Sequence, residues 1–297
     1  MTSPPRQHAP DKPAPIYGLL GCLAVFASAF CFYFSTVVIR WSSEVVDIDA
    51  AFFAFFRFLL GFAVVCAIMM LRRQKPAPRR YHHLIGRTLG NCIAVYCFYQ
   101  AVRTTSVAEA NILNMTYPIF VAILSWLLLR HQRDPVAVAM VALAVAGVWL
   151  ILQPGKIGLG VNSLWGLGSG ISAAFAILYM NFSRQDHDVN TVLFFMFGLG
   201  SVLMLIFFHS SFFWPNATHL YYLSLCGGVG IAGQFLITLG FLYVTAVEGG
   251  VISSTRILLA ALLGPWLADE PLLGWGGIVG ALMIFSANVV LAFRKGR

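Results

Sequence analysis

Long apolar runs, separated by short polar segments, make up most of the chain. A polar, proline-rich stretch occupies residues 1–15, and apolar runs follow one another from there almost to the last residue. A helix needs about 20 mostly apolar residues to cross the hydrocarbon core of a bilayer. The pattern predicts ten membrane-spanning helices, at residues 16–39, 50–71, 84–103, 107–129, 135–153, 163–183, 190–210, 218–245, 249–268 and 271–293.

The composition strengthens this interpretation, because 59% of the side chains are hydrophobic and only 10% are charged. Soluble domains carry about 25% charged residues. A soluble protein is therefore excluded, and the ten spans leave no room for a large domain outside the membrane. Residues 1–15 are expected to be a disordered tail, because they are polar and rich in proline.

The cations give the expected orientation. The net charge is +8, and the largest group of cations lies in one loop, residues 72–80. Lys and Arg are enriched in cytoplasmic loops, and most of the cations fall on one side if the N-terminus is inside. Ten spans then place both termini in the cytoplasm. The cations lie between apolar runs rather than on one accessible face, so nucleic acid is not a predicted partner.

The chain also repeats itself weakly. An offset of 140 residues pairs Thr105 with Thr245 and Trp126 with Trp266. This predicts two five-helix units, 16–153 and 163–293. Because five is odd, the second unit enters the membrane from the opposite side, and inverted repeats of this kind are typical of secondary transporters with a site near the midplane. The alternative is that apolar helices resemble one another by chance.

Three segments resemble one family. Met115-Thr116-Tyr117-Pro118 with Trp126, Arg57 within Phe-Phe-Arg-Phe-Leu-Leu-Gly, and Gly280-Ala281-Leu282 are similar to parts of an EamA unit of the drug/metabolite transporter superfamily. The length and the aromatic-rich helices most resemble the bacterial exporters of aromatic amino acids. The resemblance implies a multi-pass protein of the bacterial inner membrane that exports amino acids, aromatic ones included.

Two arginines, Arg57 and Arg256, lie well inside predicted helices. A charge at this depth is costly and is rarely kept without a partner or water. For Arg57 we expect a structural or gating role. Arg256 shares a helix face with Ser253, which favours contact with a substrate carboxylate, although simple packing is the alternative.

The carboxylates avoid the helix centres: all eleven Asp and Glu residues lie in the tail, in loops or near helix ends. Proton-driven transporters usually place a carboxylate at membrane depth, so we predict alternating access without proton coupling. An enzyme acting on lipid-linked substrates would need paired titratable groups there, which the sequence lacks. That enzyme, a channel, and a carrier of nucleotide sugars or drugs remain the alternatives.

Polar and aromatic residues at helical spacing are the candidates for the substrate site, because pockets combine apolar walls with a few polar anchors. The candidates are Tyr96, Tyr99, Gln100, Asn111, Asn114, Tyr117, Trp165, Tyr179, Gln234, Thr238, Ser253 and Arg256. For each of them, packing between helices is the alternative. Pro118 is expected to kink its helix and let it flex during transport.

Other motifs carry no function. Gly228 to Gly233 matches GxGxxG, but no strand precedes it, so dinucleotide binding is rejected. The six cysteines form no CxxC pair, and no set of side chains has metal-ligand spacing. No cofactor, metal ion or obligate protein partner is predicted, which leaves a small-molecule substrate and the lipid bilayer.

Overall fold

The structure is a computed structural model that describes residues 15–129, 135–152, 161–243 and 246–295. The regular elements in these ranges are helices. They are α1 (Pro15–Val45), α2 (Ala50–Leu71), α3 (Tyr81–Thr104), α4 (Val107–Asn114), α5 (Tyr117–Leu129), α6 (Pro135–Leu152), α7 (Ser163–Asp186), α8 (Val189–Phe208), the 3₁₀ turn η1 (His209–Ser211), α9 (Ala217–Tyr243), α10 (Ala246–Leu267) and α11 (Trp275–Lys295).

Five of the described helices are long and apolar enough to cross a membrane. These segments are Gly18–Val45, Ala50–Leu71, Ser163–Met180, Val189–Ser211 and Ala217–Gly240. Shorter apolar helices lie at Ala139–Ile151, Ile252–Leu267 and Trp275–Val290. The predicted tail, residues 1–15, lies almost entirely outside the described residues.

The observed helices differ from the predicted ones at a few ends. The first continues to Val45 instead of ending at residue 39, and the last begins at Trp275 instead of residue 271. The largest difference is in the fourth predicted helix, 107–129. It is not continuous, because α4 ends at Asn114 and α5 begins at Tyr117.

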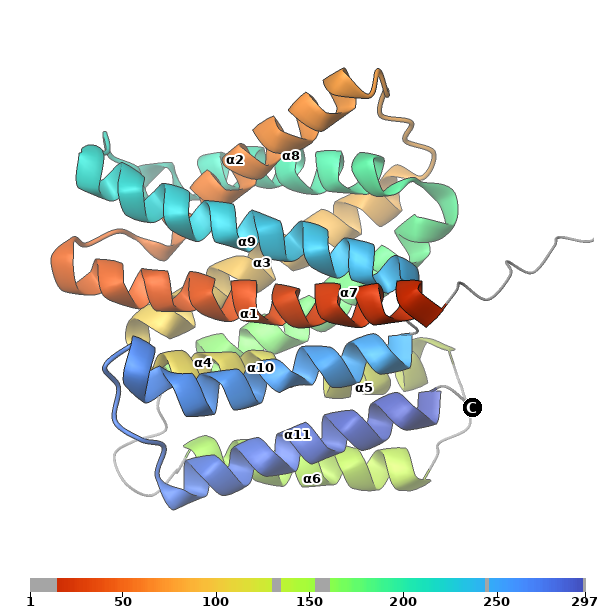
Figure 1. The fold of residues 1–297 in the computed structure, drawn as a ribbon, viewed down its shortest axis with the longest axis vertical. Helices are drawn as coiled ribbons and strands as arrows, with labels where there is room; N and C mark the ends of the chain where they lie inside the picture. Colours follow the sequence, from red (N-terminus) through yellow and green to blue (C-terminus); the bar gives the residue numbers. More distant parts are fainter. Residues whose placement is uncertain (1–14, 130–134, 153–160, 244–245, 296–297) are drawn as a thin grey trace, which may run out of the picture.

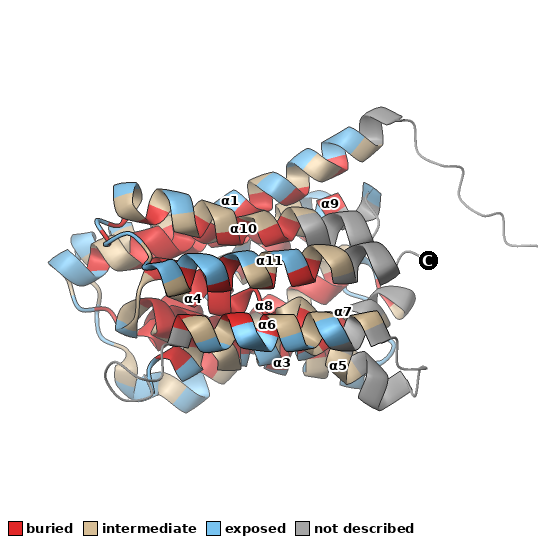
Figure 2. Ribbon diagram, turned by 90° about the horizontal axis from the view of Figure 1, so that it is seen from below, coloured by how far each residue is buried: buried red, intermediate tan, exposed pale blue. Residues whose placement is uncertain are grey.

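The helices form two layers, each of which mixes the two halves of the sequence (Figure 1). One layer runs α9, α1, α10, α11, and the other runs α3, α7, α4–α5, α6. Two pairs close the bundle at opposite ends of its long axis, α2 with α8 and α6 with α11. The most buried residues lie between the layers (Figure 2), and large apolar side chains such as Trp149, Leu205 and Trp266 are exposed on the outside. An apolar exterior of this kind suits a lipid environment.

Glycines let several of these helices approach closely. A Cβ at Gly147 in α6 would lie 2.8 Å from the carbonyl oxygen of Gly280 in α11. A Cβ at Gly90 in α3 would lie 2.9 Å from the backbone nitrogen of Ala176 in α7. Contacts this short are possible only without a side chain, and small residues serve the same purpose in membrane helix packing.

The two ends of the bundle carry different polar contacts. The start of α1, the end of α11 and the basic loop 72–80 lie on one side (Figure 1). We call this the basic end; there Asp186 lies 3.6 Å from Arg80 and 3.5 Å from His83. At the opposite end, Arg103 lies 3.4 Å from Asp49. Both ends therefore have polar links between helices.

Candidate functional site

The break between α4 and α5 is the centre of the candidate site. Pro118 lies in the first turn of α5, where its missing N–H is tolerated, but for the same reason it cannot bond to the carbonyl of Asn114. Two side chains bond to other carbonyls at the break. Asn288 Nδ2 on α11 donates to the Met115 carbonyl at 2.8 Å, and Thr116 Oγ1 donates to the Leu113 carbonyl at 2.6 Å.

Helix α7 packs directly against the break. A Cβ at Gly170 would lie 2.6 Å from Thr116 Oγ1 and 3.0 Å from the Leu113 carbonyl oxygen, and one at Gly166 would lie 2.8 Å from the Leu113 Cβ. The two glycines therefore give α7 the close approach that holds the interrupted segment.

Arg256 reaches the break from α10. Its guanidinium donates to Asn114 Oδ1, and Asn114 Nδ2 donates in turn to Ser169 Oγ on α7. Tyr117 lies beside Arg256, and Ser253 lies beside Tyr117. The side chain of Arg256 is buried, and its Nε has no hydrogen-bond partner among the described residues.

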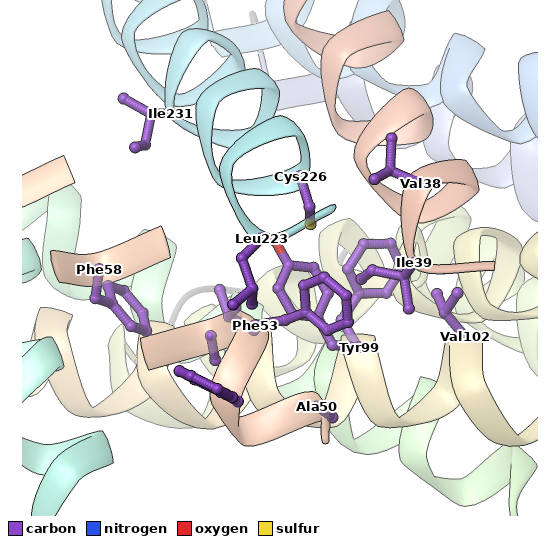
Figure 3. Close-up of a cluster of buried hydrophobic side chains, with 14 of the residues drawn as sticks. Val38, Ile39, Ala50, Phe53, Phe58, Tyr99, Val102, Leu223, Cys226 and Ile231 are labelled. Atoms are coloured by element: carbon purple, nitrogen blue, oxygen red, sulfur yellow. The ribbon is translucent and has the colours of Figure 1, made fainter. Parts of the chain in front are cut away.

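Arg57 lies in a second polar group, contributed by four helices. Its Nη1 donates to the Tyr99 hydroxyl at 3.0 Å, and that hydroxyl lies 3.4 Å from Ser35 Oγ. Ser35 Oγ donates to the carbonyl of Cys226 at 3.3 Å. Figure 3 shows Tyr99 and Cys226 within the same buried cluster as Phe53, so this polar group is surrounded by apolar side chains.

Phe32 on α1 connects the two groups. The Cζ of Arg57 lies 5.4 Å from the centre of its ring, and the Cζ of Arg256 lies 6.0 Å from it. Arg256 also lies 5.1 Å from the ring centre of Phe98. Guanidinium groups at such distances are attracted to the ring electrons, so the aromatic side chains partly compensate two buried cations.

Acidic side chains do not compensate them in the described part of the chain. The ion pairs found there involve Arg40, Arg80, His83 and Arg103, at the ends of the bundle, and not Arg57 or Arg256. Arg87 on α3 is also buried and is repelled by Arg57. An unpaired buried charge is costly, so the centre of the protein favours an anionic group.

The remaining predicted residues divide into those near this centre and those elsewhere. Asn111 joins it, because its Nδ2 donates to Thr36 Oγ1 at 3.0 Å. Tyr96 instead packs edge-on against Trp165, with ring centres 5.8 Å apart. Tyr179 fills the space that Gly86 leaves in α3. The other members of the set lie on α3 and α9: Gln100 is half-buried, Gln234 is buried, and Thr238 Oγ1 bonds to the Gln234 carbonyl.

One grouping by helical spacing, on the predicted helix 107–129, needs correction. Asn111, Asn114, Tyr117 and Pro118 do not share one continuous helix face, because the helix is interrupted between Asn114 and Tyr117. A helical wheel gives directions only within one regular helix.

Sequence reasoning missed Phe32, Ser35, Ser169 and Asn288. The last three were detectable as polar residues inside apolar runs, which is uncommon enough to mark a contact. Phe32 had no signal, because the chain holds 25 phenylalanines. The prediction for Arg57 named a structural or gating role, and its contact with Tyr99 is the detail that the structure adds.

The comparisons with known proteins were consistent. Residues 19–153 and 161–293 each match the EamA-like transporter family. Solute carrier family 35 member G1 of Homo sapiens is 24% identical over 96% of this chain and 81% of its own length. The pseudopaline exporter CntI of Pseudomonas aeruginosa strain UCBPP-PA14 is 26% identical over 92% of this chain and 95% of its own length.

A solved crystal structure supports the fold. It aligns with 93% of this chain and 99% of its own, with a TM-score of 0.60 and 20% sequence identity. The family match covers most of the sequence, in two copies, and the relatives are membrane transporters. The chain therefore belongs to the EamA-like transporter family and is a multi-pass membrane protein of the drug/metabolite transporter superfamily.

Proposed function

We propose that this protein exports amino acids, aromatic ones included, by alternating access and without proton coupling. The observation that carries the proposal is Arg256, a buried cation bonded to the last residue of an interrupted helix and beside Phe32 and Phe98. A carboxylate, a polar backbone and aromatic rings are what an amphipathic zwitterion requires of a site.

The interrupted helix supplies both signs of partial charge. A helix is partly positive at its N-terminus and partly negative at its C-terminus. At the break, two residues, Met115 and Thr116, separate the C-terminus of α4 from the N-terminus of α5. In this proposal the substrate ammonium lies at the carbonyls that end α4, and its carboxylate lies at Arg256 and the start of α5.

The architecture supports a carrier with inverted halves, 16–153 and 163–293. Exchanging α1 with α7, α3 with α9, and α6 with α11 turns one layer of the bundle into the other (Figure 1). The same exchange turns the α1–α9 contact into the α3–α7 contact. A two-fold axis between the layers would produce this arrangement, and a central site between such halves is reached alternately from each side.

The orientation in this proposal places both termini and loop 72–80 in the cytoplasm of a bacterial cell, with the protein in the inner membrane. The concentration of cations at the basic end supports it. Export rather than import is supported by one relative that bears the name of an exporter and by the resemblance to bacterial exporters of aromatic amino acids.

Proton coupling is left out because the described carboxylates lie outside the centre. Asp47, Asp49, Glu109 and Asp186 lie at helix ends or in loops. The one strongly buried carboxylate in the described chain, Glu270, lies between α10 and α11. A proton carried with the substrate usually binds a carboxylate at membrane depth.

Transport by the purified protein tests the proposal. The full chain is placed in liposomes, and uptake of labelled tryptophan and phenylalanine is measured with and without a pH gradient. Saturable uptake without the gradient is expected. Uptake that appears only with the gradient would contradict the absence of coupling, and no uptake of any amino acid would contradict the substrate.

A further inference from the structure

The short turn between α7 and α8 contacts the basic loop 72–80 at the basic end. His187 is the C-cap of α7, and Asp188 is the N-cap of α8. The His187 side chain is buried, although the loop beside it is almost entirely exposed. The loop belongs to the first family segment, 19–153, and the turn belongs to the second, 161–293. Contacts between the loop and the turn therefore join the two copies of the family unit.

The imidazole of His187 uses both of its nitrogens. Nδ1 lies 2.9 Å from the carbonyl oxygen of Ser183, one turn earlier in α7. Nε2 accepts from the backbone N–H of Arg79 at 2.9 Å and from that of Arg80 at 3.3 Å. A carbonyl oxygen can only accept, so Nδ1 carries the hydrogen and Nε2 carries none. This arrangement requires the neutral form of the ring.

A proton on His187 would break only the contact with the loop. The protonated imidazole has an N–H on each nitrogen. Nδ1 would still donate to Ser183, so the ring would stay on α7. Nε2 would direct a donor at two backbone N–H groups, which cannot accept. Because Arg79 and Arg80 are exposed, water can bond to the N–H groups that the ring no longer holds.

The charged groups near this turn are mostly cations. The loop carries five, at Arg72, Arg73, Lys75, Arg79 and Arg80. The first turn of α3 adds His82 and His83, which also become cations in acid, and the last turn of α7 adds Arg184. Like charges close together oppose one another. The loop in its bound position therefore disfavours a positive charge on the His187 ring.

Two carboxylates flank His187 in the sequence, and both are already engaged. Asp186 lies 3.6 Å from Arg80 Nε and 3.5 Å from His83 Nδ1. Asp188 accepts from a backbone N–H and a hydroxyl in the first turn of α8. Among the described residues, neither forms an ion pair with the His187 ring. A proton therefore binds the ring more readily once the loop has left, and acid shifts the population toward that form.

We propose that His187 is a pH-sensitive latch between the two family units: the neutral ring holds loop 72–80 against the α7–α8 turn, and the protonated ring releases it. Histidine is suited to this role because its charge changes between about pH 5 and 8. The release is local, because Gln74 and Asn190 also link the loop to α8, at 2.7 Å, and neither titrates. If the protein is the carrier proposed above, release would ease the opening of the basic end.

Hydrogen–deuterium exchange of the full-length protein in detergent, without substrate, tests the latch at about pH 8 and about pH 5. Each rate is divided by the rate of an unfolded peptide at the same pH, which gives a protection factor for each amide. We expect the protection of the Arg79 and Arg80 amides to fall about tenfold at the lower pH, the effect of one hydrogen bond. Amides in the middle of α8 should keep their protection and serve as the internal reference.

Three variants assign the effect to His187. His187→Gln keeps an acceptor in about the place of Nε2 and cannot be protonated, so the loop should be equally protected at both pH values. His187→Lys is always a cation and should leave the loop unprotected at both. His83→Gln is the matched control, because His83 lies at the same end and pairs with Asp186; it should respond to pH as the wild type does.

The proposal is overturned if the Arg79 and Arg80 amides of the wild type are unprotected at about pH 8, or equally protected at both pH values. It is also overturned if His187→Gln keeps the pH response, or if His83→Gln abolishes it, because the titrating group would then be the His83–Asp186 pair. If His187→Gln does not fold, the wild type and His83→Gln still decide the result. Tryptophan uptake tests the proposed function separately, since loop exchange is measured without substrate.

Discussion

At the scale of single residues, the two arginines show how buried charge is held in this protein. Arg57 and Arg256 share the ring of Phe32, and each bonds one neutral side chain, Tyr99 or Asn114. A neutral partner satisfies the hydrogen bond without cancelling the charge. The centre therefore stays positive in the described chain, and an anionic group can bind there.

Tyr99→Phe tests this arrangement at one atom. The change removes the hydroxyl that accepts from Arg57 Nη1 and leaves a buried donor unsatisfied, which costs about 1–3 kcal/mol. The free energy of unfolding should fall by this amount in denaturant titrations in detergent. Tyr221→Phe, at an exposed tyrosine, is the control and should leave stability unchanged. Equal stability of all three proteins would contradict the role of the hydroxyl.

At the scale of elements, the main feature is the interruption of the fourth predicted helix. The sequence contained the relevant proline, and Pro118 was correctly expected to disturb the helix. The position of the break, before Pro118, follows from packing: Gly170 of α7 and Asn288 of α11 contact the carbonyls and the hydroxyl there. Contacts between residues so distant in sequence are not readable from local patterns, because they depend on which helices become neighbours.

Gly170→Ala is predicted to destabilise the break. A Cβ at this position would lie 2.6 Å from Thr116 Oγ1 and 3.0 Å from the Leu113 carbonyl oxygen, so α7 would have to move away. Overpacking of this kind typically costs about 1–3 kcal/mol. Gly228→Ala is the matched control, because a Cβ there meets nothing within 4 Å. Melting curves of the two variants in one detergent give the comparison, and a Gly170→Ala protein as stable as the control would refute the prediction.

Pro118→Ala is predicted to slow transport. Alanine restores an N–H that can bond to the Asn114 carbonyl, so α4 and α5 would tend to join and the segment would lose its freedom to flex. The initial rate of amino acid uptake, normalised to the amount of protein in the liposomes, should decrease. A rate equal to that of the wild type would show that the proline is not needed for movement.

At the scale of the whole molecule, Glu270 links the halves at the end opposite the basic loop. Its carboxylate accepts from the backbone N–H groups of Val107 at 2.7 Å and Ala108 at 3.4 Å, at the start of α4. Arg40 Nε lies 3.9 Å away. One side chain thus connects α1, α4 and the α10–α11 loop. Under the proposed alternating access, this connection would have to loosen when the protein opens on that side.

Burial raises the pKa of Glu270, against the opposing effects of the two N–H groups and Arg40. A carboxyl whose pKa is higher in the folded state favours folding in its protonated form. Its contribution is present below the unfolded pKa, about 4.3, and is lost as the pH rises through the higher folded pKa. The Tm of the wild type should therefore decrease as the pH rises from about 4.3 through the folded pKa of Glu270. In Glu270→Gln, which cannot titrate, this decrease should be smaller. An unchanged pH profile of Tm would contradict the prediction.

The sequence predicted the all-helical membrane fold and the repeated family unit. The length of the hydrophobic runs was sufficient to predict the fold, because a bilayer requires each spanning segment to satisfy its own backbone hydrogen bonds. The pairing of Arg57 with Tyr99 was not predictable, although both residues were named, because the helix pattern gives a direction and no partner. The contact between Tyr96 and Trp165 was not predictable for the same reason.

Direct binding of tryptophan tests the central claim, that Arg256 at the broken helix binds the substrate carboxylate. Equilibrium binding of labelled tryptophan to the purified protein is compared for the wild type, Arg256→Gln and the exposed-loop control Arg72→Gln. Loss of one charged hydrogen bond, worth about 1.5–3 kcal/mol, predicts that Kd rises at least about tenfold in Arg256→Gln and stays constant in the control. Tryptamine, which lacks the carboxylate, should bind the wild type and Arg256→Gln equally weakly. Equal tryptophan affinity in the wild type and Arg256→Gln would contradict the account.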